Sequence, residues 1–226
     1  MNIYNTLKQD ILRIFRRQSP VSVLGPHKRA AIWVQGCEEV CPGCVVPESW
    51  DRAGGETITV AELANWIISQ KDIEGITLSG GEPMLQAAGL GSLIDMVRRH
   101  KDLGVVCYTG SRWERLGRTG TPAQKSLLER VDLLIDGPYI ESEHGDLLWR
   151  GSSNQRLLPL TERYRHILTQ HLAAGDRSAG IEFGVDLTGA FYFTGVPALK
   201  GFRAEFEARM ERQGITIKKA RATNDK

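Results

Sequence analysis

Apolar residues recur along the chain in short uninterrupted runs, separated by stretches in which they recur at helical spacing. The runs predict buried strands, because a strand inside a parallel sheet is covered on both faces. The spaced stretches predict amphipathic helices. The predicted strands are residues 31–35, 75–79, 104–108 and 131–135, and the predicted helices are residues 60–70, 90–100 and 122–130. This alternation predicts βαβ units joined into a parallel sheet, so the fold class is α/β.

The N-terminal segment has a different pattern. Ile3, Leu7, Ile11 and Phe15 are spaced four residues apart, which predicts an amphipathic helix with a basic face within residues 1–20. The segment lacks the apolar core of a signal peptide, and the chain has no run of about 18 apolar residues that would cross a membrane. We therefore expect a cytoplasmic protein without a membrane partner.

The last third of the chain departs from the alternating pattern. Residues 181–186 and 190–194 predict an antiparallel hairpin, and aromatic residues at helical spacing predict a helix over residues 201–213. We divide the chain into the N-terminal helix, a core over residues 21–160 and a C-terminal α+β extension over residues 161–226.

Composition excludes some functions. Of the 226 residues, 41% are hydrophobic and 25% are charged, which is ordinary for a globular domain. The net charge is only +2, so no nucleic-acid partner is expected. Basic residues gather near both ends of the chain. They would suit an acidic partner, although a solvated charge bias is the plainer interpretation.

Three of the four cysteines lie in one short loop. Cys37, Cys41 and Cys44 follow the first predicted strand with the spacing C-x3-C-x2-C, which is typical of metal or redox chemistry in a protein without secretory features. Zinc would need a fourth ligand, either Cys107 or a histidine such as His27. A [4Fe-4S] cluster on three thiolates leaves one iron open, so the count favours a cluster that binds a substrate or cofactor. Cys107 lies in a predicted strand and is expected in the core.

Other chemically informative segments also follow predicted strands. Gly80-Gly81-Glu82-Pro83 follows the second strand, Thr109-Gly110 the third and Asp136-Gly137 the fourth. The carboxyl ends of parallel strands meet at the edge that carries the active site in α/β folds. We expect these segments and the cysteine loop to lie together at that edge.

The cysteine triad followed by the Gly-Gly-Glu segment resembles the radical S-adenosylmethionine (SAM) superfamily. A narrower resemblance is to the activating enzymes of anaerobic ribonucleotide reductase, which are glycyl-radical activases. It covers roughly residues 21–160 and rests on further segments, namely Gly25-Pro26, Trp50, Tyr108-Thr109-Gly110, residues 131–137 and the tail motif Trp149-Arg150-Gly151-Ser152-Ser153-Asn154-Gln155. Members of that family usually end soon after the tail motif, whereas about 65 residues follow it in this chain.

The resemblance implies a partial (β/α) barrel of mostly parallel strands, with the β-hairpin and helix as a C-terminal extension. It implies that Cys37, Cys41 and Cys44 hold one [4Fe-4S] cluster whose open iron binds SAM. The residues it assigns to SAM binding are Gly80, Gly81, Glu82, Pro83, Thr109 and Asp136.

The resemblance also implies the reaction. One electron from an external flavodoxin- or ferredoxin-type reductant cleaves SAM to a 5′-deoxyadenosyl radical, which abstracts hydrogen. The hydrogen donor would be a glycyl-radical enzyme such as anaerobic ribonucleotide reductase. The alternative is direct action on a peptide or small metabolite, with the extension covering the site. A zinc-stabilised binding module would leave Gly80-Gly81-Glu82 unexplained.

Overall fold

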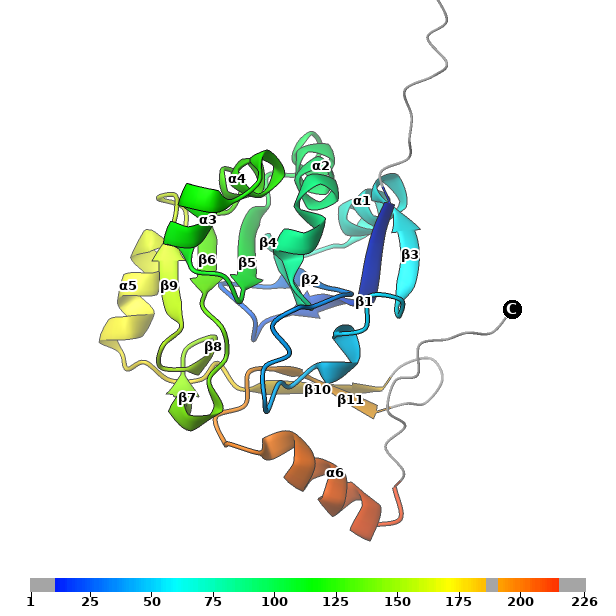
Figure 1. Cartoon of the computed structure of the whole chain (residues 1–226), viewed down its shortest axis with the longest axis vertical. Coiled ribbons are helices and arrows are strands. Elements are labelled where there is room, and N and C mark those ends of the chain that lie inside the picture. Colours follow the sequence, from blue (N-terminus) through cyan, green and yellow to red (C-terminus); the bar gives the residue numbers. More distant parts are fainter. Residues whose placement is uncertain (1–10, 186–190, 216–226) are drawn as a thin grey trace, which may run out of the picture.

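The structure is a computed structural model that describes residues 11–185 and 191–215. At its centre is a seven-stranded sheet with the order β3-β1-β2-β4-β5-β6-β9 (Figure 1). The strands are β1 (Ile11–Val21), β2 (Arg29–Val34), β3 (Glu56–Thr59), β4 (Gly75–Gly80), β5 (Gly104–Thr109), β6 (Leu133–Asp136) and β9 (Arg156–Pro159).

The four predicted strands pair in parallel as β2, β4, β5 and β6, which confirms the α/β class. The flanking strands β1, β3 and β9 are antiparallel to their neighbours. Within the described residues the strands form a row from β3 to β9 rather than a closed ring. The partial barrel therefore stays a prediction.

The expectation of a helix at the N-terminus is wrong for the residues that the structure describes. Residues 11–16 belong to β1, which pairs with both β2 and β3. A spacing of four is also a multiple of the two-residue strand period, so Ile11 and Phe15 share one face of a strand as readily as one face of a helix. Leu12 and Ile14, each 1% exposed, occupy the opposite face in the core. Residues 3–10 of the predicted helix lie outside the described part of the chain.

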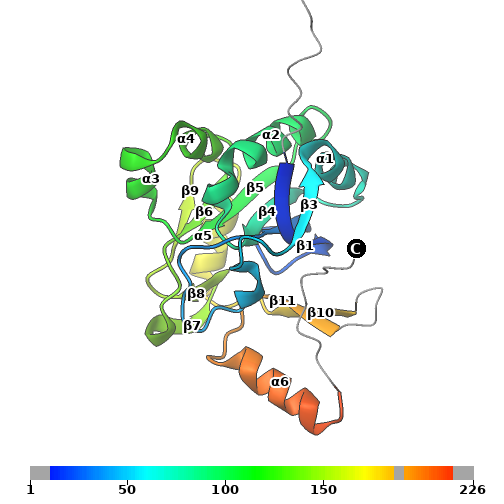
Figure 2. The ribbon, with the colours of Figure 1, turned by 45° about the vertical axis from the view of Figure 1, so that its right-hand side comes forward.

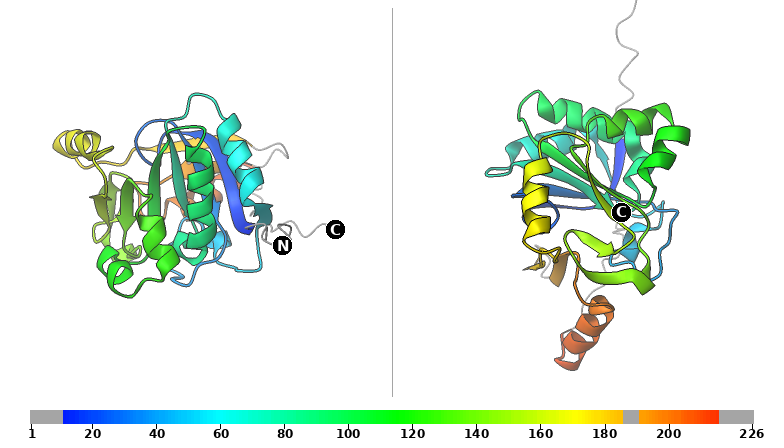
Figure 3. Two further views of the ribbon diagram at one scale, coloured as in Figure 1. Left: turned by 90° about the horizontal axis from the view of Figure 1, so that it is seen from above. Right: turned by 90° about the vertical axis from the view of Figure 1, so that its left-hand side faces the viewer.

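Four helices pack on one face of the sheet (Figure 3). They are α1 (Val60–Ser69), α2 (Ala87–Arg98), α3 (Trp113–Thr119) and α4 (Pro122–Leu128), with the short 3-10 helices η1 (Pro47–Ser49), η2 (Pro83–Gln86) and η3 (Glu141–Glu143) in the loops. A capping box starts α1, since the Thr59 hydroxyl accepts from Glu62 N at 3.1 Å and Glu62 accepts from Thr59 N at 3.0 Å. The main hydrophobic core lies between these helices and the sheet.

Helix α5 (Arg165–Ala173) covers the other face near β5 and β6, where Leu168 and Tyr164 pack against Leu133 and Ile135. The segment that connects β6 to β9 in the sequence contains two short strands, β7 (His144–Leu147) and β8 (Arg150–Ser152). They pair antiparallel as a separate small sheet.

The predicted C-terminal hairpin and helix are present as β10 (Ile181–Val185), β11 (Phe191–Gly195) and α6 (Phe202–Arg212). The residues of the predicted turn, 187–189, lie outside the described part. Phenylalanine rings pack the hairpin on α6 with centroids 5.3–6.2 Å apart. Figure 2 shows this unit on the side of the sheet away from α1 and α2.

Candidate functional site

The carboxyl ends of the parallel strands open into one cavity of about 320 Å³. The structure brings most of the predicted site residues to its wall, namely Cys37, Cys41, Cys44, Gly80, Gly81, Glu82 and Thr109. Pro83 is buried at the start of η2 and Asp136 is buried at the end of β6, and neither side chain lines the cavity. The expected convergence on one sheet edge is therefore observed for all four segments, since Gly137 also lines the cavity and Asp136 pairs with Thr109 at the strand ends.

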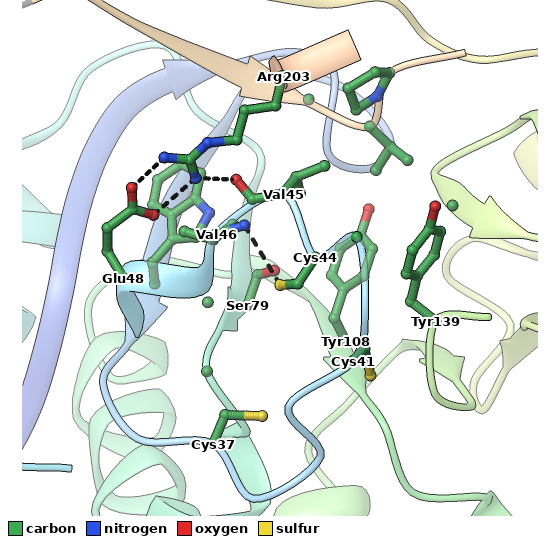
Figure 4. Close-up of a pocket in the computed structure, with 18 of the residues that line it drawn as sticks. Cys37, Cys41, Cys44, Val45, Val46, Glu48, Ser79, Tyr108, Tyr139 and Arg203 are labelled. Atoms are coloured by element: carbon green, nitrogen blue, oxygen red, sulfur yellow. Dashed lines mark hydrogen bonds and ion pairs between the residues drawn. The ribbon is translucent and has the colours of Figure 1, made fainter. Parts of the chain in front are cut away.

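The cysteine loop is closed at its base by backbone hydrogen bonds. Gly36 N donates to Ser49 O at 2.7 Å, and Cys37 N donates to Trp50 O at 3.1 Å. Gly36 (φ 99°) turns the chain out of β2 at this point, a conformation that favours glycine. These bonds hold the two ends of the loop together, and its three cysteines line the cavity (Figure 4).

The three thiols are spaced along the loop rather than gathered at one point (Figure 4). In the described part of the chain, no three Cys, His, Asp or Glu side chains converge closely enough to hold a single metal ion. A zinc site would need its sulfurs at about 2.3 Å from one centre. An iron–sulfur cluster takes each thiolate on a separate iron, so spaced thiols suit it better. Cys107 is fully buried in β5 and is part of the core, as expected.

Burial raises the pKa of the Cys41 and Cys44 thiols, and the neighbouring cysteines add to this effect. The thiolate form that ligates iron is therefore disfavoured without a positive partner. Cluster binding would supply that positive charge and release protons from these thiols.

The Gly-Gly-Glu turn packs directly against the start of the cysteine loop. Gly81 N donates to Val34 O and Glu82 N to Gly36 O, both at 2.8 Å. A Cβ on Gly81 would lie 2.2 Å from Gly36 O, and a Cβ on Gly80 (φ 96°) would lie 2.7 Å from the Trp33 backbone. The two glycines are thus needed so that the two motifs can share one wall of the cavity.

The Glu82 carboxylate links the ends of β4 and β5. It accepts hydrogen bonds from Met84 N at 2.9 Å, from the Thr109 hydroxyl at 2.9 Å and from Gly110 N at 2.8 Å. Burial raises the pKa of this carboxyl group, and the three donors act against that rise. The side chains of Glu82 and Thr109 are therefore occupied with each other, and they fix the rim of the cavity.

Asp136 is fully buried and is engaged away from the cavity. Its carboxylate accepts from Arg156 Nε at 2.8 Å and from Trp113 N at 2.7 Å. Arg156 also pairs with Glu114 at 2.8 Å. This network joins β6, β9 and the start of α3, so in this structure Asp136 holds strand ends together.

The tail motif fixes the loop after β6. Gln155 Nε2 donates to Gly137 O at 3.0 Å, and its Oε1 accepts from Gly151 N at 2.8 Å. Asn154 Nδ2 donates to Pro138 O at 2.8 Å. Tyr139, which follows, lines the cavity beside the cysteine loop (Figure 4). The sequence suggested the family from this motif but did not reveal this positioning role.

The C-terminal segment contributes to the site, as the alternative of direct action expected when it placed the extension over the site. β11 and α6 line the cavity opposite the strand ends, through Tyr192, Phe193, Phe202, Arg203 and Phe206. The aromatic spacing predicted the helix, but the sequence did not indicate which of its residues would contact the cysteine loop.

Comparisons with known proteins agree with this site. Residues 23–158 match the protein family described as a 4Fe-4S single cluster domain. The anaerobic ribonucleoside-triphosphate reductase-activating protein of Enterobacteria phage T4 is 34% identical over 146 residues, which is 62% of this chain and 89% of the relative. The protein of the same description from Vibrio cholerae is 31% identical over 154 residues, 62% of this chain and 94% of the relative.

Two more distant similarities were found. The pyruvate formate-lyase-activating enzyme of Clostridium pasteurianum is 35% identical over 98 residues, 41% of this chain and 40% of that enzyme. The crystal structure of QueE from Escherichia coli superposes with a TM-score of 0.41 at 11% identity, covering 92% of both chains.

The family matches confirm the expected cofactors, one [4Fe-4S] cluster and SAM, and the enzyme class. Within the described residues, no helix is long and apolar enough to cross a membrane. The spaced thiols and the Gly-Gly-Glu turn packed on their loop lead to the same assignment as the relatives. The chain belongs to the radical SAM superfamily, within the family of anaerobic ribonucleoside-triphosphate reductase-activating proteins.

Proposed function

We propose that this protein activates a glycyl-radical enzyme of the anaerobic ribonucleotide reductase type. The observation that carries the proposal is the direct packing of the Gly-Gly-Glu turn on the cysteine loop, with Glu82 N bonded to Gly36 O. This contact lies in the part of the chain that aligns with the two activating proteins. That part is 62% of this chain, and it covers 89% and 94% of the relatives' lengths.

Cys37, Cys41 and Cys44 are the residues that would hold the cluster. The bound cluster and SAM would supply a one-electron reductive cleavage that yields a hydrogen-abstracting radical. The chain itself would orient SAM and exclude water from the cavity. Since three protein donors already occupy the Glu82 carboxylate, the backbone oxygens of Gly80-Gly81-Glu82 are the better acceptors for the SAM ammonium group. The electron would come from a flavodoxin- or ferredoxin-type donor.

The test is anaerobic. The reconstituted protein is reduced with dithionite and mixed with SAM and a glycyl-radical reductase, and the products are analysed for 5′-deoxyadenosine. Electron paramagnetic resonance then reports a glycyl radical on the reductase. Both signals are expected from the wild type and neither from Cys41→Ala. Nucleoside without a glycyl radical would contradict the activase role but not the SAM chemistry.

A second candidate is direct action on a peptide or small metabolite. The observation that favours it is that β11 and α6 line the cavity, so a small substrate could be bound between them and the strand ends. This candidate predicts that 5′-deoxyadenosine formation rises with a free substrate and does not respond to a glycyl-radical enzyme. Dependence on the reductase alone would eliminate it.

A further inference from the structure

Arg203 connects helix α6 to the end of the cysteine loop. Arg203 Nη1 donates to Val45 O at 3.0 Å and to Glu48 Oε2 at 2.8 Å, and its Nη2 donates to the other oxygen of Glu48 (Figure 4). Glu207, one turn further along α6, accepts from Arg203 Nε at 2.8 Å. The guanidinium group is thus fixed on its own helix while it binds the loop bidentately, the strongest geometry for an arginine–carboxylate pair.

The contacted segment directly follows the last cluster ligand. Val45 is the residue after Cys44, and Val46 N points back at Cys44 Sγ at 3.4 Å. The turn closes through Ser49, whose backbone N and hydroxyl both donate to Val46 O. Arg203 therefore bonds to both ends of this turn, at the Val45 carbonyl and at the Glu48 carboxylate.

The pair is shielded from solvent. The side chains of Arg203 and Glu48 are 22% and 18% exposed, so water screens their attraction less than at an open surface. On the far side of the turn, Gln35 Nε2 donates to Glu48 O at 2.9 Å. The turn after Cys44 is thus held from the core by Gln35 and from α6 by Arg203.

A second arginine attaches the hairpin to the core. The Arg16 guanidinium lies between the rings of Trp33 and Tyr192, at 4.2 and 4.9 Å from their centroids. Its Nη2 donates to Thr194 Oγ1 at 3.1 Å. β11 is therefore fixed to β1 and β2, which gives α6 a defined position from which to hold the loop.

We propose that α6 clamps the cysteine loop and that Arg203 is a positioning residue for Cys44. The family match ends at residue 158, so this clamp is additional to the matched domain. The proposal rests on the cluster that the proposed function assigns to Cys37, Cys41 and Cys44, and it is independent of the hydrogen donor. In the described residues Arg203 forms no hydrogen bond with a thiol. It binds the Val45–Glu48 turn, and its positive charge also acts to lower the pKa of the Cys44 thiol.

Cluster retention tests this clamp without SAM, reductant or partner. Full-length wild type, Arg203→Gln, Arg203→Lys and Arg209→Gln are reconstituted anaerobically with iron and sulfide, and iron release to excess chelator is timed. Arg209 is an exposed arginine of the same helix and serves as the matched control. Arg203→Gln should release iron faster on the order of fivefold. The rate of iron release from Arg203→Lys should lie between those of wild type and Arg203→Gln, since one ammonium group cannot bind the turn bidentately. Arg209→Gln should behave as wild type.

A double-mutant cycle separates the clamp from a general loss of folding. Glu48→Gln is measured alone and combined with Arg203→Gln. If the arginine acts through Glu48, its replacement changes the release rate less in the Glu48→Gln background. Additive effects, or equal release from Arg203→Gln and wild type, would overturn the clamp. A wild type that takes up no iron would instead refute the cluster assignment itself.

Discussion

The Thr109 hydroxyl donates a hydrogen bond to the Glu82 carboxylate at 2.9 Å, and this bond joins the carboxyl ends of two neighbouring parallel strands. Both residues were expected to contact SAM. Their side chains hold the cavity rim in place, so that the backbone of the Gly-Gly-Glu turn is presented in a fixed position. Contact of either residue with SAM stays a prediction. A buried carboxylate with three donors is costly to alter, because each donor would lose its partner inside the protein.

Glu82→Gln is therefore expected to weaken the fold. The glutamine amide has one oxygen for three donors, and its NH₂ group would face one of them. We expect the free energy of unfolding to fall by about 1–3 kcal/mol in urea titrations of the apoprotein. Glu56→Gln, at an exposed strand position, should change it little. Equal stability of the two variants would contradict the rim role.

Gly81→Ala should disrupt the contact between the two motifs. The added Cβ would meet Gly36 O at 2.2 Å, and neither backbone can move without disturbing β2 or β4. We expect a loss of about 3 kcal/mol in unfolding free energy, together with poor cluster uptake. Gly117→Ala is the control, because a Cβ there meets nothing within 4 Å and alanine favours a helix. A fully stable, cluster-loaded Gly81→Ala protein would refute this account.

Gln155→Ala should loosen the loop after β6 without unfolding the sheet. The change leaves Gly151 N and Gly137 O without their side-chain partner. Hydrogen exchange of residues 137–144 should become faster, while exchange in β4 and β5 stays slow. Gln170→Ala, at an exposed position of α5, is the comparison. Unchanged exchange in Gln155→Ala would show that the loop is held by other contacts.

Cys107→Ala should bind the cluster normally. Cys107 is fully buried in the core and does not line the cavity, so its loss costs only packing, about 1 kcal/mol. Iron and sulfide content after reconstitution should equal that of wild type, whereas Cys41→Ala should lose the cluster. Loss of iron from Cys107→Ala with an intact fold would assign it a ligand role.

The Arg156 network predicts a pH dependence. The hydrogen bonds from Arg156 lower the pKa of Glu114 to about 2 in the folded protein. A lowered folded-state pKa means that the stabilisation is present above the unfolded value of about 4.5 and is lost as the pH falls toward 2. The stability difference between wild type and Glu114→Gln in urea should therefore be largest at neutral pH and shrink on acidification. A difference that is constant from pH 7 to pH 3 would contradict the assignment.

Local patterns allowed the parallel strands, the cysteine loop and the Gly-Gly-Glu turn to be predicted, since each depends on residues close together in sequence. The role of Asp136 could not be predicted, because its partner Arg156 is 20 residues away and arrives on an antiparallel strand. The N-terminal strand was missed because apolar residues four apart fit both periods. The contact of Arg203 with the cysteine loop joins residues 155 positions apart in the sequence, and no short motif predicts it.

The clamp on the cysteine loop joins residues that leave the ribosome at different times. Arg203 follows Glu48 by 155 positions, which corresponds to about 8–30 s of ribosomal synthesis. Throughout that interval the nascent chain has the three cysteines of the loop but not helix α6. A scaffold protein that delivers iron and sulfur during this interval would meet an open loop, whereas one that acts after chain release would meet a closed one. The long sequence separation between the cysteine loop and α6 thus makes the timing of cofactor delivery a variable of this protein's biogenesis.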